Sequence, residues 1–99
     1  AYLGVAVVPS PVAPVWRRKL GGRSTGLRVA SVVPGGPADR AGLRVGDLLL
    51  TVGGHEVATA QDLQRLMFAE AIGRQLPITV MRNGALVDVI TEPAELAAA

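Results

Sequence analysis

The chain has 99 residues and a net charge of +2, from ten basic and eight acidic residues. This length suits one compact domain, and a hydrophobic content of 49% is enough to form an aliphatic core. The absence of cysteine excludes disulfides and thiolate metal sites. The basic residues are mostly scattered, which argues against a nucleic-acid partner. No run of about 20 apolar residues predicts a membrane-spanning helix.

The first predicted strand lies in the apolar run of residues 2–8 and ends at Pro9. Because proline fixes φ and lacks an N–H group, Pro9, Pro11 and Pro14 are expected to prevent regular structure directly after it. A short helix is predicted over residues 14–20, with proline at its first position and glycine past its end.

The basic residues 17–19 fall in the last turn of this helix, where cations complement the helix dipole. We interpret them as a solvated helix end. A site for an acidic partner is the alternative.

The next predicted strand covers residues 27–33, with Leu27, Val29 and Ser31 on one face and Val32 on the other. One helical turn follows over residues 37–41, between a proline and a glycine. Another apolar strand is predicted over residues 47–52.

The longest predicted helix covers residues 60–72, with Thr59 as its N-cap and Asp62 completing a capping box. Strands over residues 76–81 and 85–91 are expected to form a hairpin. The sequence Asn83-Gly84 between them is the strongest short signal for a type I′ turn. Core pairs are expected across this hairpin, with Ile78 and Val80 facing Val87 and Val89.

The order of these elements predicts an α+β fold, mostly β: a small, partly open β-barrel of about five strands capped by two or three helices. We expect one domain over residues 1–92, followed by a tail over residues 93–99 that is flexible or not native. The sequence opens without Met or a signal peptide, so we expect a piece of a longer protein.

Several segments, in this order, resemble PDZ domains. Residues 42–50 (GLRVGDLLL) resemble the family's G-L-x-x-G-D-x-I/L segment. Residues 32–38 (VVPGGPA) and 52–57 (VGGHEV) are similar to its flanking motifs, although Gly53 replaces the usual Asn. The resemblance covers residues 2–91.

The start of the chain resembles one subgroup of that family. The placement of the sequence YLGV at residues 2–5 and the insert at residues 14–20 are similar to HtrA-type (Deg-type) trypsin-like serine proteases. Similarity to the PDZ domains of membrane-embedded zinc proteases and of C-terminal processing proteases is weaker.

The resemblance implies a carboxylate-binding loop formed by Tyr2, Leu3, Gly4 and Val5. Backbone N–H groups of this loop are expected to converge on the carboxylate of a peptide, and glycine permits the close approach. Because an edge strand has unpaired backbone groups, Val5, Ala6 and Val7 are expected to pair with the peptide. Pro9 limits how far that pairing runs.

The opposite wall of this groove is expected on the long helix. Ala60, Gln64 and Met67 have the spacing that places them along one side, and they match the family's groove-facing positions. Met67 with Leu3 and Val5 is expected to form an apolar pocket for a small or aliphatic terminal side chain. Plain core packing of Met67, and packing of Tyr2 against the barrel, are the alternatives.

Three features that resemble catalytic chemistry are interpreted as structural. Residues 22–26 match G-x-S-x-G, but a nucleophile elbow needs a strand before the serine and a helix after it. His55 lies in a predicted turn and is expected to be solvated. Asp47 is expected to hydrogen-bond nearby turn amides. We therefore expect no enzyme activity and no cofactor in this chain.

Two functions stay open from the sequence. The resemblance implies a peptide-binding module that binds C-termini or extended segments of unfolded or partner proteins, and so regulates or targets proteolysis by an attached protease domain. The alternative is a structural or assembly module that mediates inter-domain or oligomer contacts. The resemblance also implies an extracytoplasmic location. The scattered basic residues and the lack of a long apolar run predict neither nucleic-acid nor membrane contact by this chain.

Overall fold

The computed structural model describes residues 3–17, 25–69 and 75–93. Predictions for Tyr2, for residues 18–20 of the first helix, for residues 70–72 of the longest helix and for residues 94–99 lie outside this part of the chain. The backbone of Met67 is described, but the prediction for its side chain lies outside the description.

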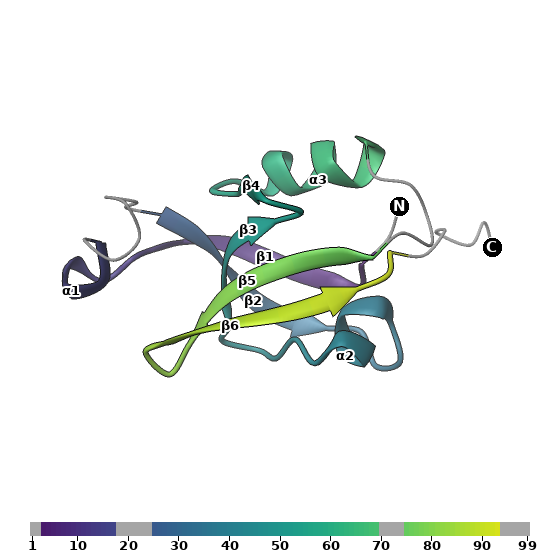
Figure 1. The fold of residues 1–99 in the computed structure, drawn as a ribbon, viewed down its shortest axis with the longest axis horizontal. Helices are drawn as coiled ribbons and strands as arrows, with labels where there is room; N and C mark the ends of the chain where they lie inside the picture. Colours follow the sequence, from purple (N-terminus) through teal and green to yellow (C-terminus); the bar gives the residue numbers. More distant parts are fainter. Residues whose placement is uncertain (1–2, 18–24, 70–74, 94–99) are drawn as a thin grey trace.

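Within the described residues, six strands and three helices follow one another along the chain (Figure 1). The strands are β1 (Val5–Pro11), β2 (Thr25–Val32), β3 (Leu48–Val52), β4 (His55–Glu56), β5 (Leu76–Arg82) and β6 (Ala85–Thr91). The helices are α1 (Pro14–Arg17), α2 (Pro37–Ala41) and α3 (Ala60–Ala69).

All strands belong to one antiparallel sheet with the order β1-β2-β3-β5-β6, and β4 pairs with β3. In the described part of the chain no pairing joins β1 to β6, so the sheet is open and these two strands are its edges. Figure 1 shows α3 on one side of the sheet and α2 on the other, beside β6. The predicted mostly-β, partly open fold is confirmed.

The core lies inside the curved sheet and is aliphatic, as the composition requires. Its buried members come from β2, β3, β5, α2, α3 and the segments beside them, and partly buried valines of β1 and β6 pack against them. Burial of this apolar surface holds the elements together. The buried members are Leu3, Leu27, Val29, Ala38, Leu43, Leu49, Val52, Val57, Leu63, Leu76, Ile78 and Val80.

The first strand does not end at Pro9, as the sequence predicted, but continues to Pro11. The prediction was wrong because a proline is tolerated in an edge strand where its nitrogen faces away from the neighbouring strand. Both prolines meet that condition, as the hydrogen bonds of β2 show.

The backbone of Val29 fixes this direction. Its N–H donates to the carbonyl of Asp47 at 2.8 Å, and its carbonyl accepts from the N–H of Gly46 at 2.9 Å, so both groups face β3. Val7 pairs with Val29. In an antiparallel pair, two opposite residues either both point their N–H and carbonyl groups at each other or both point them away from each other. Val7, and Pro9 two residues further on, therefore turn theirs toward the free edge of the sheet.

The predicted faces of β2 are wrong at its end. Consecutive β1 residues pair with Ser31 and Val29, which leaves Ala30 as an extra residue in a β-bulge. One extra residue exchanges the two faces of a strand. Ser31 is therefore exposed, and Val32 packs against the core.

The local turn and cap signals are confirmed. Asn83 and Gly84 have φ values of 52° and 78°, as a type I′ turn requires. The facing pairs in the hairpin are as predicted, namely Ile78 with Val89 and Val80 with Val87. At the start of α3 the Asp62 N–H donates to Thr59 Oγ1 at 3.1 Å, and the Thr59 N–H donates back to the Asp62 carboxylate at 3.0 Å. This is the reciprocal capping box.

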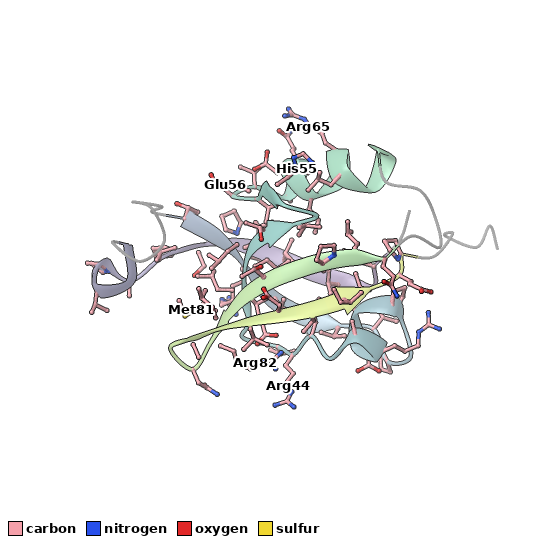
Figure 2. The ribbon with its side chains drawn as sticks, viewed as in Figure 1. Arg44, His55, Glu56, Arg65, Met81 and Arg82 are labelled. Carbon is pink, nitrogen blue, oxygen red and sulfur yellow. The ribbon has the colours of Figure 1, made fainter. Side chains whose placement is uncertain are left out.

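An ion pair joins the hairpin to the segment between α2 and β3. Arg82 donates from Nε and Nη2 to the two carboxylate oxygens of Asp47, at 2.8 and 2.5 Å. Its Nη2 also donates to the carbonyl of Gly42 at 2.9 Å. The Arg44 N–H donates to the same carboxylate at 3.0 Å, which confirms the predicted bond from a turn amide. Figure 2 shows Arg44 and Arg82 on the side of the sheet away from α3.

Asp47 is only 2% exposed, so its charge depends on these partners. Burial alone raises the pKa of this carboxyl. The hydrogen bonds from Arg82 and Arg44, and the positive charge of Arg82, outweigh burial and lower the pKa below its ordinary value of 3.8. The hydrogen bonds that Arg82 donates to Asp47 in turn raise the pKa of Arg82.

We expect Arg82→Met to lower the free energy of unfolding by about 2–3 kcal/mol, because it leaves the buried Asp47 carboxylate without its cation. Urea unfolding followed by circular dichroism measures this. Arg28→Met, on the exposed face of β2, is the matched control and should cost at most about 0.5 kcal/mol. Equal losses in the two variants would contradict a structural role for the ion pair.

Acid should remove the stability that Asp47 provides. Its folded-state pKa lies below the unfolded-state value, so the ionised carboxylate stabilises the fold above about pH 3.8 and loses that effect as the pH falls through the folded-state pKa. Asp47→Asn should therefore be clearly less stable than the parent chain at neutral pH and nearly equal to it in strong acid. A stability difference that does not change with pH would rule this out.

Candidate functional site

The segment before β1 is held in place through its carbonyl groups. The Ala38 N–H donates to the carbonyl of Leu3 at 2.9 Å, and the Val33 N–H donates to the carbonyl of Gly4 at 2.8 Å. Gly36 packs closely here, since a Cβ on it would lie 3.7 Å from the Cα of Gly4. Both carbonyls therefore point toward the turn between β2 and α2.

The N–H groups of the same peptide units point the other way. In a planar trans peptide the carbonyl and the following N–H are opposed, and the described residues contain no cis peptide bond. The N–H groups of Gly4 and Val5 are therefore directed away from β2 and α2. Gly4 has a φ of 79°, a conformation that glycine adopts without strain. Two adjacent amides that point outward in this way can accept an anion.

The free edge of β1 continues from these amides. Val5 and Val7 turn their N–H and carbonyl groups outward, while their side chains are half-buried against the core. Ala6 between them has an exposed side chain. From Val5 to Val7 the edge thus offers both donors and acceptors to an added strand.

The helix α3 lies next to this edge and contacts β1. Leu63 is buried and Leu66 packs against the core, as predicted. Ala60 and Gln64, one turn apart, are exposed. The structure thus brings β1 and α3 together, with polar and small side chains of the helix left outside the core.

The other chemistry-bearing residues lie apart from this edge. His55 is exposed on β4, as expected for a solvated residue, and Figure 2 shows it with Glu56 and Arg65 at the β4 end of α3. In the part of the chain that the structure describes, no cluster of three or more His, Cys, Asp or Glu residues could hold a metal ion. Most of the G-x-S-x-G match lies outside the described residues.

The sequence did not indicate the groups that orient the loop. The two donors are the backbone amides of Val33 and Ala38, whose residue types carry no signal for this role. The sequence did predict a break between the strand and the helix at this turn, where Gly35 has a φ of 75°. The contact of this turn with Leu3 and Gly4 depends on the tertiary fold.

These features define a small β-rich domain with an accessible sheet edge beside a helix. A family profile described as "PDZ domain" matches residues 1–92. The chain belongs to the PDZ domain family, and it is of the kind found in HtrA-type serine proteases.

Relatives and solved structures agree with this assignment. A probable DegP-like periplasmic serine endoprotease of Hahella chejuensis is 36% identical over 73 residues, which are 74% of this chain and 16% of the relative. A protein of Brucella suis that is named as a zinc metalloprotease is 40% identical over 65 residues, 66% of this chain and 17% of that protein. The structure of the HtrA-type protease AlgW with a decapeptide is similar with a TM-score of 0.78 and 31% identity, over 99% of this chain and 30% of AlgW.

The chain thus corresponds to less than a third of each of these proteins. Within the residues that the structure describes, none of the helices has the length and apolarity needed to cross a membrane.

The orientation of the loop can be tested through Gly4. We expect Gly4→Ala to lower the free energy of unfolding by about 1–2 kcal/mol, because an L-residue is strained at this positive φ. Gly35→Ala is the matched control: its φ is 75°, and a Cβ there meets nothing within 4 Å. Both variants should lose similar stability in urea.

Only Gly4→Ala should shift the amide NMR resonance of Val5, because Gly4 directly precedes it in the loop. Gly35 lies in the turn between Val33 and Ala38, so both variants are expected to shift those two amides. An unchanged stability for Gly4→Ala would mean that the loop does not need the left-handed conformation.

Proposed function

We propose that this domain binds C-terminal or extended peptide segments by strand addition to β1, on behalf of an attached HtrA-type serine protease. The observation that carries the proposal is the outward direction of the Gly4 and Val5 amides at the start of β1. In the described part of the chain, the outer edge of β1 pairs with no other strand. An added strand supplies the missing hydrogen-bond partners of such an edge.

In this proposal Tyr2, Leu3, Gly4 and Val5 form the carboxylate-binding loop. Oriented amides carry enough partial charge to hold a carboxylate without a cationic side chain. The backbone of residues 5–7, namely Val5, Ala6 and Val7, pairs with the peptide.

The groove helix contributes Ala60, Gln64 and Met67. Leu3, Val5 and Met67 provide the pocket for the terminal side chain, which favours a small or aliphatic residue. Ala60 has no hydrogen-bonding side chain, so selectivity for the residue two positions before the terminus should be weak.

We place the domain at residues 1–92, where the family profile ends, with residues 93–99 as its tail. The chain itself carries no catalytic role in this proposal, because peptide capture requires none. The protease activity belongs to the longer parent protein, and an extracytoplasmic location is supported by the periplasmic relatives. The AlgW structures with bound peptides support a peptide as the partner.

Titration with a library of free C-terminal peptides should detect ligands with a Kd of about 1–100 μM, the range expected for a few side-chain contacts and a short ladder. Amide NMR shifts should cluster at residues 3–7 and 60–67. C-terminal amidation removes a charged acceptor and should weaken binding about tenfold or more. Gly4→Ala should weaken binding, whereas Gly35→Ala should not.

If no peptide binds, the chain is better explained as a structural or assembly module. Equal binding of free and amidated peptides would indicate recognition of internal segments instead, with no role for the carboxylate loop.

A further inference from the structure

The free edge of β1 changes its chemistry halfway along. Its outward-facing positions are every second residue, namely Val5, Val7, Pro9 and Pro11. All four have a carbonyl group, but only the first two have an N–H group. Beyond Val7 this edge therefore accepts hydrogen bonds and donates none.

We infer that Pro9 and Pro11 determine how much of a ligand the groove can pair with, so that full backbone pairing is confined to the last three residues of a bound chain. This inference rests on the proposed function. It makes the two prolines specificity-determining residues, which act on ligand length rather than on ligand side chains.

The register of an antiparallel ladder leads to this limit. With the carboxylate on the Gly4 and Val5 amides, the N–H of the terminal ligand residue meets the carbonyl of Val5. The residue two positions earlier exchanges both hydrogen bonds with Val7. The residue four positions earlier faces Pro9, where its N–H finds an acceptor but its carbonyl finds no donor.

Packing within the domain does not account for the prolines. Pro9 and Pro11 are exposed, so neither belongs to the core. They also do not serve the ladder to β2, because Val8 and Ser10 are the residues whose backbone groups face that strand. The missing donors therefore affect only the free edge, where a ligand would add.

The prolines can also be explained as protection of an exposed edge against pairing with other chains. That explanation predicts an effect on self-association and none on the affinity for short peptides. The two can be separated by measuring binding and oligomeric state on the same variants.

The test uses N-acetylated peptides with one shared C-terminus and lengths from about three to eight residues, titrated into the 99-residue chain by calorimetry. For the parent chain, affinity should rise up to about five residues and then change by less than about twofold. For Pro9→Ala, peptides of about five residues or more should bind roughly two- to tenfold tighter than to the parent, the effect of one net hydrogen bond. The shortest peptide should bind both equally.

Ser10→Ala is the matched control, because the Ser10 amide faces β2, and it should reproduce the length dependence of the parent. If Pro9→Ala does not fold, the length series on the parent chain and on Pro11→Ala still decides the question. Affinity that keeps rising with each added pair of residues in the parent overturns the inference. So does a Pro9→Ala variant that binds long peptides no more tightly, including one whose only change is self-association. Failure of every peptide to bind any variant overturns the proposed function instead.

Discussion

The direction of two carbonyl groups determines what the head of β1 presents to a partner. The carbonyl of Leu3 accepts a hydrogen bond from the Ala38 N–H in α2, and the carbonyl of Gly4 accepts one from the Val33 N–H at the end of β2. Since the peptide unit is planar, the opposed N–H groups must then face outward. The outward direction of these N–H groups is thus a consequence of the hydrogen bonds that hold the loop against Val33 and Ala38. The left-handed conformation of Gly4 makes this possible without strain.

The support behind the loop extends across the molecule. Ala38 lies in α2, and the residue that ends this helix, Gly42, accepts a hydrogen bond from Arg82. Arg82 is in turn held by the buried carboxylate of Asp47, directly before β3. The loop is therefore hydrogen-bonded to α2, and the end of α2 is hydrogen-bonded to an arginine that forms an ion pair with a distant part of the chain. A weakened ion pair should first loosen α2, which is the element that orients the Leu3 carbonyl.

Local signals in the sequence were sufficient to predict most of the helices, strands and turns. The pairing between segments that are distant in the sequence could not be predicted from them. The turn at Asn83-Gly84 was predictable because two adjacent residues tolerate positive φ. The passage of β1 through Pro9 was not, because it depends on which way β2 turns its amides. Arg82 lies 35 residues from Asp47, so no spacing in the sequence links them. For the site, resemblance suggested the loop and the edge, but the outward direction of the Gly4 amide required the fold.

An open sheet has two edges, and in this sheet they are protected from pairing with other chains in different ways. The end of β6 is covered by α2, where Thr91 donates to the carbonyl of Pro37. On the free edge of β1 the outward-facing N–H groups end at Val7, so an added strand can form only a short ladder of hydrogen bonds. In the proposed register, a short ladder leaves the carboxylate and the terminal side chain with most of the binding free energy. Such a groove discriminates between a free chain end and an internal segment more sharply than a long edge, where backbone pairing alone holds either one.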